Sequence, residues 1–220
     1  MTASPTVVLL SGLGADQRVF RHWPLHQVHH QILDWIPPKK GESLPAYALR
    51  MADRIDAQGP VFLVGVSFGG MLAVEIAHHR PVAGTMLIST AKGRPEFRQI
   101  FRWPWMGKLF RRVPRLFWVP PAWFLDWLFS PLSPEEKTLI REILKDTDPA
   151  FVRWAMEAIV RWDRKEWEVP MLHIHGQKDL LLPYQRIKTT HLVPEAGHFL
   201  VHSHPDYLYD LLQQMIDAYE

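Results

Sequence analysis

The sequence contains no cysteine, and it has no large excess of charge of either sign. Without cysteine the chain has no disulfides, no thiolate metal ligands and no cysteine nucleophile, and this absence is compatible with a reducing compartment. The 25 lysines and arginines are offset by 23 aspartates and glutamates, which leaves a formal net charge of +2. So small a net charge gives no reason to expect nucleic acid as a partner.

Long hydrophobic runs are also missing. The longest mainly apolar stretch, Val61 to Val74, is interrupted by Ser67 and by three glycines, and it is shorter than the roughly 20 residues that a membrane-spanning helix needs. Met1 to Pro5 show neither the basic region nor the apolar stretch of a secretory signal. We therefore expect no membrane-spanning helix and a cytoplasmic location.

The composition is that of a globular protein with a substantial hydrophobic core. Of the 220 residues, 47% are hydrophobic and 22% are charged, which is far from the composition of disordered chains. This length fits a single domain, 1–220, and is too short for two large domains.

Short β-branched or leucine-rich runs alternate with helix-like segments, which predicts parallel strands joined by crossover helices. The expected strands are Thr6–Ser11, Gln31–Ile36, Val61–Val66, Val82–Ser89, Pro170–His175 and His191–Pro194. Helices are predicted over Leu44–Asp56, over Gly69–His79 and at the carboxyl end, where apolar residues follow helical spacing. Most of the strands are too apolar for a sheet with one solvent-exposed face. The predicted fold class is therefore α/β, with helices on both faces of a mostly parallel six-stranded sheet.

Residues 92–168, between the fourth and fifth expected strands, differ in composition from the rest of the chain. They hold eight of the ten tryptophans and eight of the nineteen prolines. Ser133-Pro134-Glu135-Glu136 has the pattern of a capping box with proline at the first helical position, and Asp148-Pro149 indicates a second helix start. We predict a mostly helical cap or lid inserted after the fourth strand.

Gly65-Val66-Ser67-Phe68-Gly69 overlaps the end of the third expected strand and runs directly into a helical pattern. A strand, a sharp turn and a helix in this order are the setting of a nucleophile elbow, with Ser67 as the nucleophile. Small residues two positions before and after the serine let the strand and the helix approach each other, so that the hydroxyl projects from the turn. The alternative is a glycine-rich turn with an incidental serine.

A serine hydroxyl needs a general base, and the base needs a carboxylate that orients it. Asp179 lies in the loop after the fifth expected strand, where open α/β sheets build their sites, and we predict it to be the orienting acid. His198 lies in the loop after the sixth strand and is the predicted general base. Asp163, Glu195 and Asp206 are alternative acids, but none of them follows a strand as closely as Asp179.

The chain order of serine, acid and histidine resembles that of the α/β-hydrolase superfamily, and the resemblance covers essentially the whole length. The motifs that carry it are Ser11-Gly12-Leu13-Gly14, Gly65-Val66-Ser67-Phe68-Gly69, His175-Gly176-Gln177-Lys178-Asp179 and Gly197-His198-Phe199. The resemblance implies an oxyanion hole made of the backbone N–H groups of Leu13 and Phe68. It also implies a spatial strand order of 2-1-3-4-5-6 and a small enzyme similar to serine carboxylesterases, which need no cofactor.

Three features depart from the pattern of this superfamily. Ser11 stands where a histidine usually precedes the first-loop glycine, which leaves the support of that loop in question. The chain begins where the third strand of the superfamily would lie. Serine rather than aspartate at the elbow argues against epoxide and halide chemistry, and ester-type acyl chemistry remains.

Twelve histidines raise the question of a metal site. Neighbouring residues on a helix point in different directions, and no carboxylate stands at a recognised ligand spacing from the paired histidines. We therefore expect no metal ion, and we expect His202 and His204 to be surface residues at the start of the last helix. The histidine groupings considered are His29-His30, His78-His79, His173-x-His175 and His202-x-His204.

Segment 92–118 has eight basic residues against a single acidic one, and it is rich in aromatic residues. This composition suits a solvated basic face whose aromatic residues pack over the active site, or a weak contact with a membrane surface or an acidic partner. The aromatic residues favour a hydrophobic substrate. The residues expected to bind it are Leu13, Phe68, Trp103, Trp123 and Trp127.

The principal hypothesis is a serine hydrolase that cleaves a small carboxylic ester with a hydrophobic acyl or alcohol group. It acts through Ser67, His198 and Asp179 and an acyl-enzyme. A thioesterase, an acyltransferase or a carbon–carbon hydrolase would use the same three residues. A binding protein for hydrophobic ligands that has kept the fold without catalysis is a further alternative. The sequence gives no indication of the oligomeric state.

Overall fold

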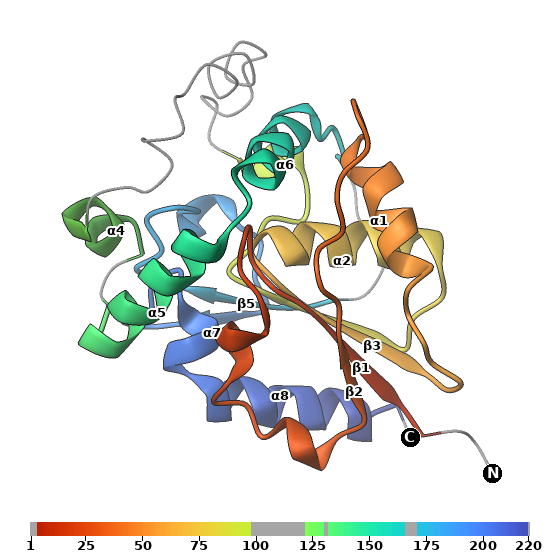
Figure 1. The fold of residues 1–220 in the computed structure, drawn as a ribbon. Coiled ribbons are helices and arrows are strands. Elements are labelled where there is room, and N and C mark those ends of the chain that lie inside the picture. Colours follow the sequence, from red (N-terminus) through yellow and green to blue (C-terminus); the bar gives the residue numbers. More distant parts are fainter. Residues whose placement is uncertain (1–3, 98–121, 130–131, 166–170, 220) are drawn as a thin grey trace.

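Parallel strands form one sheet in the computed structural model, which describes residues 4–97, 122–129, 132–165 and 171–219 (Figure 1). Within these residues the sheet has six strands in the order β2-β1-β3-β4-β5-β6. Their bounds are β1 (Thr6–Leu10), β2 (His30–Ile32), β3 (Val61–Val66), β4 (Gly84–Ile88), β5 (Leu172–Gly176) and β6 (His191–Val193). The predicted fold class and strand order are confirmed.

Both faces of the sheet are covered by helices. The bounds are α1 (Leu44–Ala52), α2 (Phe68–His79), α7 (Leu200–Ser203) and α8 (Pro205–Asp217), with the short 3-10 helices η1 (Gln17–Phe20), η2 (Leu25–Gln27), η3 (Arg94–Glu96) and η6 (Tyr184–Arg186). The helices α1 and α2 lie on one face, and α7 and α8 lie on the other (Figure 1). Within β1, Val8 and Leu10 face the core beneath α1 and α2, whereas Val7 and Leu9 face the core on the α8 side. Successive side chains of a strand point to opposite faces, so the whole of β1 is buried and its sequence is almost entirely apolar.

The strand β2 is shorter than the predicted strand Gln31–Ile36, because the chain leaves the edge of the sheet after its third residue. The N–H of Leu33 still donates to the carbonyl of Leu9 at 3.0 Å. Further on, the hydroxyl of Tyr47 on α1 accepts from the N–H of Ile36 at 3.0 Å and donates to its carbonyl at 2.9 Å. One side chain thus satisfies both backbone groups that a neighbouring strand would have paired.

In the described part of the chain, three α-helices lie between η3 and β5. They are α4 (Ala122–Phe129), α5 (Pro134–Asp146) and α6 (Pro149–Arg161), and we refer to them as the insertion helices. They agree with the helical character predicted for segment 92–168. Residues 98–121 lie outside the described residues, so the role of the segment as a cap or lid stays a prediction.

Two of the insertion helices start at the predicted caps. Ser133 and Glu136 form a capping box before α5, in which each side chain bonds to the backbone of the other. At the start of α6, Oδ1 of Asp148 accepts from the N–H of Ala150 at 2.8 Å. Caps of this kind contribute about 1 kcal/mol each, so local sequence alone sets where these helices begin.

A buried ion pair fixes the chain that follows α6 to the helix α2. Glu75 on α2 is fully buried. Nε and Nη2 of Arg164 lie 2.6 and 2.9 Å from its two carboxylate oxygens, and the indole N–H of Trp162 donates to it at 2.6 Å. The hydrogen bonds with Glu75 raise the pKa of Arg164 above its ordinary value. Loss of one partner would leave a buried charge unpaired, at a cost of about 3–5 kcal/mol.

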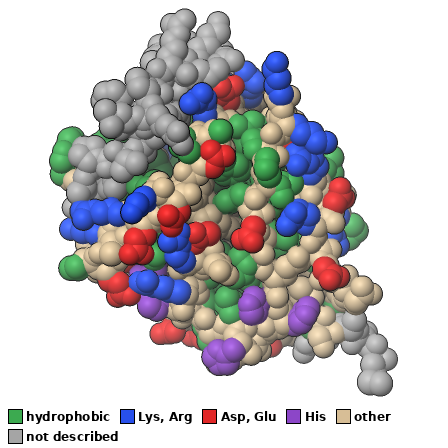
Figure 2. Space-filling model, viewed as in Figure 1, with side chains coloured by type: hydrophobic (Ala, Val, Ile, Leu, Met, Phe, Trp, Pro, Cys, Tyr) green, Lys and Arg blue, Asp and Glu red, His purple; other side chains and the backbone are tan. Residues whose placement is uncertain are grey.

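The surface carries mixed charges, in line with the small net charge. On the face shown in Figure 2, lysine and arginine side chains are interspersed with aspartate and glutamate, and hydrophobic side chains reach the surface between them. Among the helices of the described ranges, none combines the length and the hydropathy that crossing a bilayer requires.

Candidate active site

Ser67 occupies the sharp turn between β3 and α2. Its backbone adopts φ 51° and ψ −116°, a conformation that costs a non-glycine residue about 1–3 kcal/mol. Neighbouring groups hold the turn: the N–H of Ser67 donates to the carbonyl of Ile88 at 2.9 Å, and the hydroxyl of Thr90 donates to the carbonyl of Ser67 at 2.5 Å. The turn therefore has the strand, the strained serine and the helix that the motif predicts.

Two glycines permit this turn, because their neighbours leave no room for a side chain. A Cβ atom on Gly65 would lie 2.6 Å from the carbonyl oxygen of Gly69. A Cβ atom on Gly69 would lie 2.3 Å from the carbonyl oxygens of Leu10 and Ser11. Leu10 also pairs with Gly65 in the sheet, so the loop after β1 emerges directly beside Ser67.

His198 and Asp179 reach Ser67 from the loops after β6 and β5. Nε2 of His198 lies 3.0 Å from Oγ of Ser67, and Nδ1 of His198 lies 2.7 Å from Oδ2 of Asp179. Because an ionised carboxylate only accepts hydrogen bonds, the proton of the neutral ring is assigned to Nδ1, and Nε2 is left to accept from the serine hydroxyl. The structure thus brings the three predicted residues together in the arrangement of nucleophile, base and orienting acid.

A second histidine contacts the same carboxylate. His175 on β5 is fully buried, and its Nε2 lies 2.7 Å from the carbonyl oxygen of Leu182 and 3.2 Å from Oδ2 of Asp179. Both neighbours accept, so the proton of this ring is assigned to Nε2. The N–H of Leu182 donates to Oδ1 of Asp179 at 2.8 Å. Both carboxylate oxygens are therefore held, and His175 is a positioning residue to which the sequence analysis assigned no role.

These contacts keep Asp179 ionised inside the protein. Burial by itself would raise the pKa of Asp179, but the charge of His198 and the hydrogen bonds from His175 and His198 outweigh it and hold the pKa well below its ordinary value. An acid that stays charged at neutral pH can stabilise an imidazolium that forms on His198 during reaction.

The three alternative acids are exposed, whereas Asp179 is buried. Glu195 is exposed and pairs with Lys178, and Asp163 and Asp206 are exposed as well. Of the four carboxylates considered, all of them in the described ranges, only Asp179 is hydrogen-bonded to His198.

The loop after β1 lies against Ser67 and is held by Ser11 from within the loop and by Trp35 from the segment after β2. A Cβ atom on Gly12 would lie 3.7 Å from the Cβ atom of Ser67. The hydroxyl of Ser11 donates to the carbonyl of Ala15 at 2.8 Å, and the indole N–H of Trp35 donates to the same carbonyl at 2.8 Å. The serine that replaces the usual histidine therefore supports the loop through a hydrogen bond of its own.

The predicted oxyanion donors are the backbone N–H groups of Leu13 and Phe68, the residues that follow Gly12 and Ser67. Phe68 is the first residue of α2, where N–H groups lack intrahelical partners and the helix dipole favours negative charge. Leu13 follows Gly12 in the adjacent loop. The function of the two N–H groups as an oxyanion hole stays a prediction.

The predicted substrate-binding tryptophans differ in their placement. Trp123 and Trp127 lie on α4 with 70% and 55% of their surface exposed, and Trp103 lies outside the described residues. From the same helix, the ring of Phe129 lies 5.6 Å from the ring of His198. Phe129 is therefore a side chain of α4 that lies beside the predicted base, and binding by the tryptophans stays a prediction.

Aromatic side chains cover Phe68, the residue after the nucleophile. The rings of Trp35, Phe151 and Trp154 lie 5.5, 6.2 and 6.1 Å from its ring. Phe68 is 1% exposed, so its side chain supports the turn from inside the core, and Leu13 packs against the same core. Phe151 and Trp154 were not among the predicted site residues; the signal that could have found them is the apolar spacing of α6, whose buried residues include Phe151 and Ala155.

The fold and this arrangement of residues define the protein as an α/β hydrolase. A model of the Alpha/beta hydrolase family matches residues 7–211, and the chain belongs to this family. A search of the curated proteins gave no significant match.

Solved structures of similar fold include two esterases and a further protein. The esterase EaEST from Exiguobacterium antarcticum superimposes with a TM-score of 0.77 at 15% identity, over 99% of this chain and 93% of its own. A thermophilic esterase from Thermogutta terrifontis superimposes with a TM-score of 0.73 at 19% identity, over 99% of this chain and 91% of its own. MenH from S. aureus superimposes with a TM-score of 0.75 at 17% identity, over 100% of this chain and 96% of its own. At these identities the likeness concerns the fold.

Proposed function

We propose that this α/β hydrolase is a serine esterase that cleaves small carboxylic esters with a hydrophobic acyl or alcohol group. The observation that carries the proposal is the hydrogen-bonded chain from Ser67 through His198 to Asp179, with distances of 3.0 and 2.7 Å. The hydrophobic preference is supported by Phe129 beside His198 and by Leu13, which packs against the aromatic core.

The reaction follows from this geometry. Oγ of Ser67 attacks the ester carbonyl while Nε2 of His198 takes its proton, and Asp179 stabilises the imidazolium. The backbone N–H groups of Leu13 and Phe68 stabilise the negative oxygen of the tetrahedral intermediate, each by about 3 kcal/mol. The imidazolium then protonates the leaving alcohol, and an acyl-enzyme on Ser67 remains. Water, deprotonated by His198, attacks the acyl-enzyme, releases the acid and restores the serine.

The test is the hydrolysis of p-nitrophenyl esters of increasing acyl length by the wild type and by Ser67→Ala, with Ser203→Ala as the control at an exposed serine. We expect Ser67→Ala to lose about 10⁴-fold or more in kcat/KM, while circular dichroism reports an unchanged fold and Ser203→Ala keeps its activity. Hydrolysis by folded Ser67→Ala at the rate of the wild type would overturn the proposal.

Covalent labelling separates an esterase from a binding protein. A fluorophosphonate should label the wild type at Ser67 and leave Ser67→Ala unlabelled, because the probe reacts only with an activated serine. If the folded wild type stays unlabelled, the chain is a receptor. Added alcohols distinguish a transferase, because they divert the acyl group only if the acyl-enzyme prefers them to water.

Other parts of the prediction rest on the sequence. The contact of segment 92–118 with a membrane surface or an acidic partner involves residues that lie largely outside the described ranges. We retain this contact, a cytoplasmic location and independence of cofactors for the ester reaction as proposals.

A further inference from the structure

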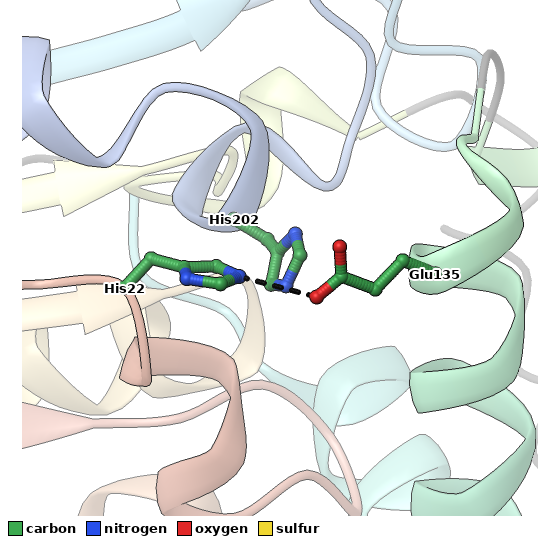
Figure 3. A group of neighbouring side chains, drawn as sticks. All are labelled: His22, Glu135 and His202. Atoms are coloured by element: carbon green, nitrogen blue, oxygen red, sulfur yellow. Dashed lines mark ion pairs between the residues drawn. The ribbon is translucent and has the colours of Figure 1, made fainter.

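A second group of imidazole and carboxylate side chains lies outside the candidate active site. His22 follows η1, Glu135 lies on α5 and His202 lies on α7 (Figure 3). One ligand atom from each residue lies within 4.8 Å of the other two, and Nε2 of His22 lies 3.6 Å from Oε1 of Glu135. Figure 3 shows the side chains converging from three segments, with one nitrogen of His202 next to the line that joins His22 to Glu135.

His202 is held in one orientation by a carboxylate behind it. Its side chain is 5% exposed, which corrects the expectation of a surface residue. Nδ1 of His202 lies 3.3 Å from Oε1 of Glu136, and the other oxygen of Glu136 accepts from the N–H of Ser133 at 2.7 Å. Because the carboxylate accepts, the proton of the ring is assigned to Nδ1 and the lone pair to Nε2.

That lone pair is buried and unused. Nε2 of His202 has no hydrogen-bond partner within the described residues, and buried polar atoms are rarely left in this state. The rings of His22 and His202 are 4.5 Å apart. Histidines that bind metal ions typically donate their second N–H to a carboxylate, as His202 does to Glu136.

We propose that His22, Glu135 and His202 bind a divalent ion of the Zn²⁺ class, with Glu136 as the carboxylate that orients His202. Two imidazoles and one carboxylate are a ligand set of Zn²⁺ sites that keep one position for water. Mg²⁺ and Ca²⁺ prefer oxygen ligands and suit this set less. Neighbouring histidines in the sequence predicted no metal ion, whereas these ligands come from three distant segments.

Binding of the ion joins the segment after β1, an insertion helix and the helix α7. The first two are already linked, because Nη2 of Arg18 lies 2.9 Å from Oδ2 of Asp146 at the end of α5. The helix α7 begins two residues after His198. The ion therefore stabilises the attachment of α5 next to the segment that carries the proposed general base, and it takes no part in the ester chemistry.

Arg21 competes with a cation for two of these ligands. Its guanidinium pairs with Glu135, and its Nε donates to Nε2 of His22 at 3.3 Å. The side chains of Arg21, His22 and Glu135 are 37%, 41% and 62% exposed. Exposed ion pairs contribute little to stability, so a metal ion displaces the guanidinium readily, and removal of Arg21 strengthens metal binding.

The test is titration of the untagged, chelator-treated protein with Zn²⁺ by calorimetry. We expect the wild type to bind one ion per chain. The affinity for Zn²⁺ should be at least tenfold lower in His22→Ala and in Glu135→Gln, and higher than that of the wild type in Arg21→Ala. His26→Ala is the matched control, because His26 is an exposed histidine outside the group, and its affinity should equal that of the wild type. Zn²⁺ should raise the Tm of the wild type and of His26→Ala, because a ligand of the folded state stabilises it.

These variants change exposed side chains, so the test does not depend on replacing the buried His202. Absence of stoichiometric binding by the wild type would overturn the proposal, as would equal affinity of the wild type, His22→Ala and Glu135→Gln. If the group is only an ionic tether, Arg21→Ala lowers the Tm and leaves the response to Zn²⁺ unchanged, which also overturns it.

Discussion

His198 and His202 lie four residues apart in the chain and are oriented in the same way. In each ring Nδ1 faces a carboxylate oxygen, that of Asp179 at 2.7 Å and that of Glu136 at 3.3 Å. The two rings differ in what Nε2 meets. For His198 it is the hydroxyl of Ser67 at 3.0 Å, whereas Nε2 of His202 has no hydrogen-bond partner in the described part of the chain.

In both histidines the carboxylate sets the tautomer, and the group that Nε2 meets differs and favours a different chemistry. The third group of His198 is a hydroxyl on a strained turn that is held from two sides, which suits a base that must meet its partner in one geometry. The groups near His202 are two exposed side chains, His22 and Glu135, which can move to surround an ion. The first arrangement suits the proposed proton transfer, and the second suits the proposed ligation of a metal ion.

The largest expected effect is on ester hydrolysis. His198→Gln should lower kcat/KM by about 10⁴-fold, because an amide cannot take the proton of Ser67, whereas His202→Gln should lower it by less than tenfold. Steady-state kinetics with p-nitrophenyl esters measure both, at equal folded concentration. The contrast between the two histidines fails if the variants lose activity to the same extent.

A histidine without a carboxylate partner sharpens the comparison. His173 on β5 is buried, and its Nε2 donates to the carbonyl of Thr90 at 3.1 Å. Burial lowers the pKa of His173 to about 3 from 6.5, helped by the nearby charges of Lys92 and His175. The folded protein therefore keeps this ring neutral, and the unfolded chain takes up a proton as the pH falls below 6.5.

Stability from His173 is thus fully present above pH 6.5 and is lost as the pH falls toward 3. By pH 5 the loss should be about 2 kcal/mol. His173→Gln keeps a hydrogen bond to Thr90 and cannot titrate. Between pH 7 and pH 5, its free energy of unfolding should therefore fall by about 2 kcal/mol less than that of the wild type. Urea unfolding at the two pH values tests this, and equal losses for the wild type and the variant would contradict the assignment.

The smallest expected effect concerns His175, which contacts the carboxylate of Asp179 but not the serine. His175→Phe fills the space without a donor, and we expect kcat to fall about tenfold with KM unchanged, as for one lost hydrogen bond to a charged group. His175→Gln can restore the donor and should recover most of kcat. A change in KM in place of the fall in kcat would show that His175 does not position Asp179. Equal kcat values for His175→Phe and His175→Gln would show the same.

Much of the fold follows from local patterns. The apolar runs predicted the strands, because a strand buried on both faces has few polar positions, and Ser133 and Asp148 marked helix starts through their caps. The end of β2 could not be predicted, because the hydroxyl of Tyr47, from another element, pairs with the backbone of Ile36. Backbone groups satisfied by a distant side chain leave no periodic signal.

Hydrophobic period, small residues and the ends of strands are local features, so the sequence alone predicted the strands, the turn at Ser67 and the loop positions of Asp179 and His198. The strand order was implied by the resemblance to the α/β-hydrolase superfamily. The contact of His175 with Asp179, and the burial of His202 against Glu136 beside His22 and Glu135, became visible only in the folded chain. These residues are far apart in the chain, and their hydrogen bonds and ligand sets form only when packing brings the segments together. The residue spacing within one segment does not predict how that segment packs against another.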